Sequence, residues 1–133
     1  MTTILAIHGG EIVGYATVAS DGLTWTQHVR ELRIMVSETM RGRHLGRLLT
    51  EQAFLASIRS GEETLAAALL SVAADVPMPW VARAAELRSG RGITSLAWRA
   101  GFSMRAAVAA QSALGKLGPG EVLTAAHGGG FPM

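Results

Sequence analysis

Three early stretches of the chain predict strands; in the second of them, residues 11–18, both faces are fairly apolar, so we expect that strand to be covered on both sides. Residues 3–8 and 11–18 predict two antiparallel strands, because Gly9-Gly10 between them is a two-residue turn signal that permits positive φ. Residues 31–36 alternate cleanly and predict a further strand. Its two faces are Leu32, Ile34 and Val36 on one side and Glu31, Arg33 and Met35 on the other.

A helical period follows, from Leu45 to Ser60, and Gly61 supplies a stop signal. The expected apolar stripe is Leu45, Leu48, Leu49, Ala53, Leu55 and Ala56. The expected polar side is Arg47, Thr50, Glu51 and Ser57, with Phe54 and Ile58 placed there to meet another element or a partner chain.

The character of the chain changes after Gly61. Residues 64–74 are apolar and alanine-rich, and the pattern leaves open a parallel strand or a helix, since alanine favours helix and disfavours strand. Further helices are predicted over 80–88, 93–100 and 105–117. We therefore expect an α+β fold with a mixed, mostly antiparallel sheet and helices packed on it, followed by an alanine-rich helical or irregular segment. The expected parts are a core over 1–61, a diverged helical continuation of the same domain over 62–117 and a flexible tail over 118–133.

Composition narrows the classes of function. The 133 residues are 49% apolar, which is enough for one domain with a real core. Cysteine is absent, and His8 has no second ligand at useful spacing, so we expect no metal site. The net charge is only +2, which gives little support to a nucleic-acid partner. No run approaches the ~20 apolar residues of a membrane span and no signal peptide is evident at the start, so the expected location is the cytoplasm.

The loop between the strand ending at Val36 and the helix opening near Leu45 carries the most distinctive chemistry. Because the first amides of a helix lack partners within it, and glycine permits close approach of a ligand, this loop suits a phosphate group. Arginine side chains would add charge-assisted hydrogen bonds to phosphate oxygens. The residues concerned are Arg41, Gly42, Arg43, Gly46 and Arg47.

The hexamer Arg41-Gly42-Arg43-His44-Leu45-Gly46 resembles the acetyl-coenzyme A signature of the GNAT N-acetyltransferase superfamily, Gln/Arg-x-x-Gly-x-Gly/Ala. His44 occupies the position of the middle glycine, and the resemblance extends over roughly residues 3–61. It implies an incomplete GNAT-like fold in which the loop holds the pyrophosphate of coenzyme A and the strand before it pairs with the pantetheine arm. The implied cofactor-binding residues are Ile34, Met35, Val36, Arg41, Gly42, Arg43, His44, Leu45, Gly46 and Arg47.

The resemblance implies transfer of an acetyl group from acetyl-CoA, as co-substrate, to an amine of a small molecule or protein. Glu31 is the best candidate for the base and His28 the second, because imidazole titrates near neutral pH. The family often carries a thiolate-protonating tyrosine four residues before a Gly-Phe pair, and Ala97 stands at that position here. A degenerate, non-catalytic coenzyme A-binding or interaction module is therefore the alternative. The sequence leaves open whether residues 62–133 are a native, truncated or frame-shifted ending, and exposed strand edges suggest a homodimer.

Overall fold

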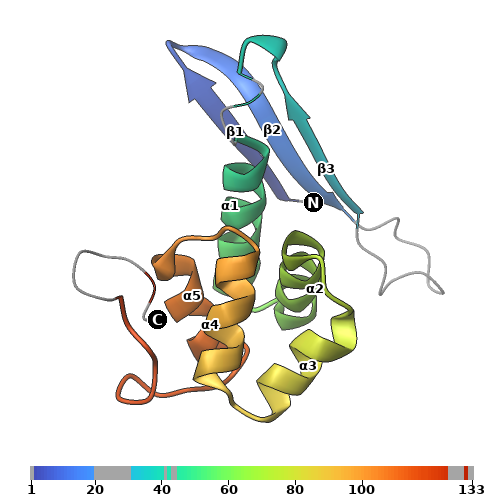
Figure 1. The fold of residues 1–133 in the computed structure, drawn as a ribbon. Coiled ribbons are helices and arrows are strands. Elements are labelled where there is room, and N and C mark those ends of the chain that lie inside the picture. Colours follow the sequence, from blue (N-terminus) through green and yellow to red (C-terminus); the bar gives the residue numbers. More distant parts are fainter. Residues whose placement is uncertain (1, 20–30, 41, 43–44, 126–130, 132–133) are drawn as a thin grey trace, which may run out of the picture. The chain divides into compact units, whose positions relative to one another are not determined.

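The structure is a computed structural model, and it describes every residue except 1, 20–30, 41, 43–44, 126–130 and 132–133. The chain divides into two compact units, Met1–Ala53 and Phe54–Met133. The first contains a sheet and the second contains helices, so the predicted α+β fold is confirmed (Figure 1).

The sheet of the first unit has three antiparallel strands in the order β1-β2-β3. They are β1 (Thr2–His8), β2 (Glu11–Ala19) and β3 (Glu31–Val36), as the alternating pattern predicted. Gly9 and Gly10 join the first two strands at φ of 61° and 82°, the left-handed values that a two-residue hairpin turn needs.

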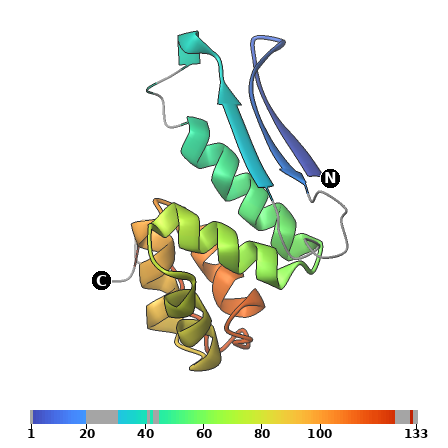
Figure 2. The same cartoon turned by 90° about the vertical axis from the view of Figure 1, so that its right-hand side faces the viewer.

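One face of this sheet packs against the start of helix α1 (Leu45–Arg59), which lies beside the strands in Figure 2. Gly14 and Ala16 of β2 are buried on this face. A Cβ atom at Gly14 would lie 3.2 Å from a methyl group of Leu45 and 3.4 Å from one of Leu49. The absence of a side chain at Gly14 thus lets the helix approach the sheet closely.

A β-bulge near the hairpin changes which face of the sheet the following side chains of β2 occupy. Ala6 pairs with Gly14 but Ile7 pairs with Ile12, so Val13 is the extra residue on β2. Ile7 and Ile12 consequently share the face opposite the helix, which we call the outer face.

The second unit includes the end of α1 and the helices that follow it. These are α2 (Glu63–Ala74), α3 (Met78–Glu86), α4 (Gly90–Arg99) and α5 (Met104–Ala113). Residues 64–74 were open between strand and helix, and the structure has them as helix. The other predicted helices are present, each with ends shifted by a few residues.

Local signals explain where these helices begin and end. Ser89 and Ser103 cap α4 and α5, because their hydroxyl groups accept hydrogen bonds from the amides of Gly92 at 2.9 Å and Ala106 at 3.3 Å. Asp75 ends α2 in the left-handed conformation, with φ of 55°.

The burial along α1 corrects part of its predicted pattern. Phe54, expected to meet another element or a partner chain, is fully buried and meets Phe102, whose ring centroid lies 5.2 Å away. Glu51 and Ser57, expected on the polar side, are buried, whereas Leu48 of the predicted apolar stripe is 52% exposed. A single apolar stripe was wrong, because the buried pairs Leu49/Ala53 and Glu51/Leu55 lie on different faces of the helix.

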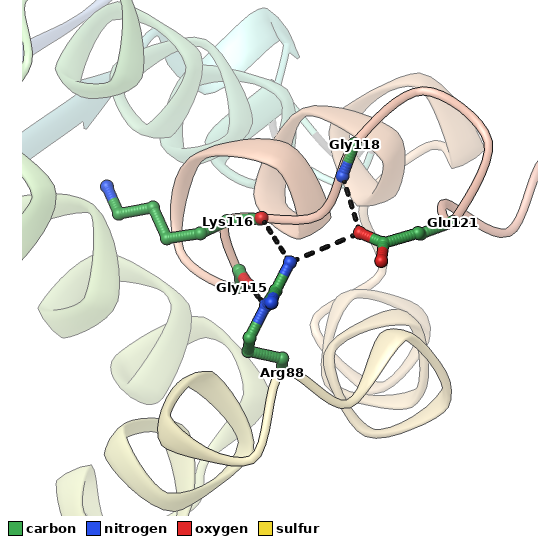
Figure 3. A network of polar contacts seen from close by, with 5 residues as sticks. All are labelled: Arg88, Gly115, Lys116, Gly118 and Glu121. Carbon is green, nitrogen blue, oxygen red and sulfur yellow. Dashed lines mark hydrogen bonds and ion pairs between the residues drawn. The ribbon is translucent and has the colours of Figure 1, made fainter.

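The segment after α5 is held by polar contacts with the helices. The buried amide of Gln111 donates to the carbonyl of Leu123 and accepts from its N–H, at 2.9 and 2.8 Å. Arg88 donates to the carbonyls of Gly115 and Lys116 and to Glu121, which also accepts from the N–H of Gly118 (Figure 3). This network fastens residues 115–123 within the second unit.

Candidate functional site

The loop from β3 to α1 contains the described part of the predicted phosphate site. β3 ends at Val36, a 3-10 helix η2 (Glu38–Met40) follows, and α1 begins at Leu45, as predicted. Gly42 has φ of 83°, a conformation that other residues rarely adopt, and no atom of the described residues lies within 4 Å of the position its Cβ would take. The predicted residues Arg41, Arg43 and His44 lie outside the described residues.

The first turn of α1 presents backbone amides that the helix itself does not use. The amides of Leu45, Gly46 and Arg47 precede the first possible hydrogen bond within the helix. At Gly46, the nearest neighbour of a Cβ would be a methyl group of Ile34 at 4.0 Å, an ordinary van der Waals distance. Packing among the described residues therefore does not require glycine at this position. The Arg47 side chain is exposed.

The backbone of β3 offers a second set of polar groups. The amide of Ser37 donates to the carbonyl of Val13 at 2.7 Å, which fixes the hydrogen-bonding phase of the β2–β3 pair. In an antiparallel pair, hydrogen-bonded and non-hydrogen-bonded residue pairs alternate, so Met35, two residues before Ser37, exchanges hydrogen bonds with its partner Tyr15. The residues in the alternate positions, Ile34 and Val36, direct their N–H and C=O groups away from β2.

That other side of β3 is a sheet edge. β3 is terminal in the strand order, and no described strand pairs with its far side. Ile34 therefore connects two features: its backbone faces the open edge, and its side chain lies beside Gly46 at the start of α1. The structure brings together a helix N-terminus and a row of backbone groups that no described strand pairs with.

Two details were missed at the level of the sequence. The prediction named three consecutive residues of β3, but strand alternation leaves only Ile34 and Val36 able to pair with a ligand through their backbone. Gly14 was not singled out, although it lets Leu45 and Leu49 seat the helix against the sheet. A glycine inside an otherwise regular strand is the signal that could have found it.

The candidate catalytic residues are less well defined. Glu31 opens β3 and pairs with Ala19, at the opposite end of the strand from the loop. His28 lies outside the described residues. Ala97, at the position that the resemblance gives to a tyrosine, is fully buried in α4.

The described residues also bear on metal binding and on membrane insertion. No three acidic or histidine side chains there come close enough to bind a metal ion. None of the described helices has both the length and the apolar character needed to cross a bilayer.

Comparison with known proteins gives one match. The model of the family described as "Acetyltransferase (GNAT) family" matches residues 1–73, which include the sheet, the loop and α1. No curated protein and no solved structure matches the chain.

Proposed function

The chain belongs to the acetyltransferase (GNAT) family, and from this membership we propose that it binds acetyl-CoA and transfers the acetyl group to an amine. The single observation that supports the proposal best is the open edge of β3 beside the start of α1. The acceptor is a small-molecule or protein amine, and the reaction fits a protein of the cytoplasm.

The residues present fit the two polar parts of acetyl-CoA. The outward N–H and C=O groups of Ile34 and the outward C=O of Val36 can pair with the amides of an extended pantetheine chain, as a further strand would. The amides of Gly46 and Arg47 point out of the helix start, where the helix dipole favours a diphosphate. No atom of the described residues lies within 4 Å of the Cβ position of Gly42, which supports a place for phosphate oxygens there. Arg41, Arg43 and His44 complete the proposed binding loop.

The ligand supplies an acetyl thioester, and the protein must stabilise the charge that develops when an amine attacks it. The outward N–H of Val36 is our candidate donor to the thioester oxygen. A backbone N–H held in place beside this oxygen stabilises the negative charge that develops on it in the transition state. The attacking amine must also lose a proton. Glu31 is the candidate base, with His28 as the second candidate.

The position of Glu31 constrains that proposal. Val36 lies five positions after Glu31 on the same strand, which corresponds to about 17 Å at the rise of an extended strand. Direct transfer over that distance is not possible. The proton of the attacking amine would have to reach Glu31 through a chain of water molecules or through polar groups of the acceptor molecule.

A proline substitution tests the role of Val36 without breaking the sheet. Val36→Pro removes an N–H that faces the open edge, and proline is tolerated at such positions. We expect catalytic efficiency to fall about 100-fold, as for loss of one oxyanion donor, with an unchanged Tm. Met35→Pro is the control, because it removes a hydrogen bond to Tyr15 and should lower the Tm. Unchanged activity in a folded Val36→Pro variant would contradict the assignment.

A non-catalytic coenzyme A-binding module is the second candidate. The observation that favours it is Ala97, which has no proton to give to a departing thiolate. Calorimetry with acetyl-CoA, paired with an assay of thiol release over a panel of amines, separates the two. Binding with thiol release supports the enzyme, and binding without release supports the module.

A further inference from the structure

The outer face of the sheet carries most of the exposed large apolar side chains of the first unit. They come from all three strands and are Leu5, Ile7, Ile12, Tyr15 and Met35. Leu5, Tyr15 and Met35 form one row across the sheet, since Tyr15 pairs with both of the others. The bulge adds Ile7 and Ile12 to the same face.

The apolar area of the outer face is large for a small unit. The five side chains are between 38% and 65% exposed, which leaves on the order of 500 Å² of apolar surface, near the upper end of what a monomer shows. Arg33 is the only charged residue among the described side chains of this face, and it lies at one end. The described side chains at the centre of the face therefore cannot form ion pairs with an acidic or a basic partner.

We propose that the outer face is a homodimer interface, in which two copies of the chain pack sheet against sheet. An apolar face without central charges is complementary to itself, and self-complementarity is what a two-fold interface requires. Two such faces together would bury roughly 1,000 Å², the lower limit for a specific interface. The proposal is independent of acetyl-CoA binding, and it differs from pairing between strand edges because the contact involves the central strand β2.

Tyr15 distinguishes the two modes of dimerisation. It lies on β2, which has a neighbour on each side, so its substitution does not touch a free strand edge. Tyr15→Lys would place a charge in the middle of the interface, where its desolvation is unfavourable. Met35→Lys provides a second variant on a different strand.

Leu48→Lys is a matched control. Leu48 is 52% exposed against 55% for Met35, and it lies on α1 rather than on the outer face. The three variants therefore introduce the same charge at exposed positions of the same unit, and only two of them lie on the proposed interface.

Sedimentation equilibrium of the full chain over roughly 1–200 μM, the range in which small interfaces dissociate, measures the association. We expect the mass to rise from 13.9 kDa toward twice that value. Tyr15→Lys and Met35→Lys should each raise the dissociation constant at least about tenfold, and Leu48→Lys should leave it unchanged.

Three outcomes would overturn the proposal. A monomer at every concentration would show that no second copy covers the face. A dimer insensitive to Tyr15→Lys would point to strand edges or to the helical unit. Unfolding of both outer-face variants as monomers, seen by circular dichroism, would show that the face is covered within one chain.

Discussion

Replacing Gly14 with valine tests how α1 is held beside the sheet. A Cβ at this position would lie 3.0 Å from the carbonyl oxygen of Met35, and 3.2 and 3.4 Å from methyl groups of Leu45 and Leu49. The leucine side chains can rotate, but the carbonyl belongs to the neighbouring strand and can move only with it. Gly14→Val must therefore displace β3, the helix or both.

The magnitude follows from two opposing effects. Overpacking of this kind costs about 1–3 kcal/mol. Replacing glycine also lowers the conformational entropy of the unfolded chain, which stabilises the folded protein by about 0.4–1 kcal/mol. The expected net loss is about 1–2 kcal/mol, or a fall in Tm of roughly 4–10 °C. Since the displaced elements form the proposed acetyl-CoA site, affinity for acetyl-CoA should fall as well.

Thermal unfolding followed by circular dichroism measures the loss, and calorimetry measures the affinity. Thr17→Val is the control, because it adds a β-branched apolar residue to the same strand on the outer face, where Thr17 is only half-buried. Its Tm should change little. A Gly14→Val protein with the Tm of the wild type would refute the close packing of the helix on the sheet.

The remaining predictions concern the second unit and are measured by denaturant unfolding. Gln111→Leu should lower stability by about 1–3 kcal/mol, because the N–H and C=O of Leu123 lose their partners; a smaller change would mean that water replaces the amide. Arg99→Met should cost about 1 kcal/mol, because it removes a 2.7 Å hydrogen bond to the last carbonyl of α2, and an unchanged midpoint would count against that contact. Glu121→Gln should cost no more than about 0.5 kcal/mol, since its ion pair with Arg88 is more than half exposed, so a large loss would contradict this view of the pair.

The first unit could be predicted closely from its sequence. Strict alternation over residues 31–36 and the Gly9-Gly10 turn each determine local structure by themselves. The register of β2 and β3, in which Gly14 pairs with Val36, was not predicted. The phase of the backbone hydrogen bonds could not be predicted, because it depends on the single contact between Ser37 and Val13. That phase decides which residues of β3 can meet a ligand.

The second unit was harder to predict for a physical reason. Residues 64–74 are so rich in alanine that they show no alternation of apolar and polar positions, and their pattern therefore did not distinguish a strand from a helix. The burial of Phe54 depends on Phe102, which lies 48 positions later in the chain and leaves no periodic trace near α1. The contact of Gln111 with Leu123 likewise has no signal in local composition.

The central claim is that the open edge of β3 and the start of α1 together bind acetyl-CoA. Amide resonances of the isotope-labelled protein, recorded by NMR during titration with acetyl-CoA, test it residue by residue. We predict saturable shifts at Ile34, Val36, Gly42 and Gly46 in the wild type, and loss of those shifts in Gly46→Trp. The absence of saturable shifts in the wild type, or shifts confined to the helices after α1, would contradict the claim.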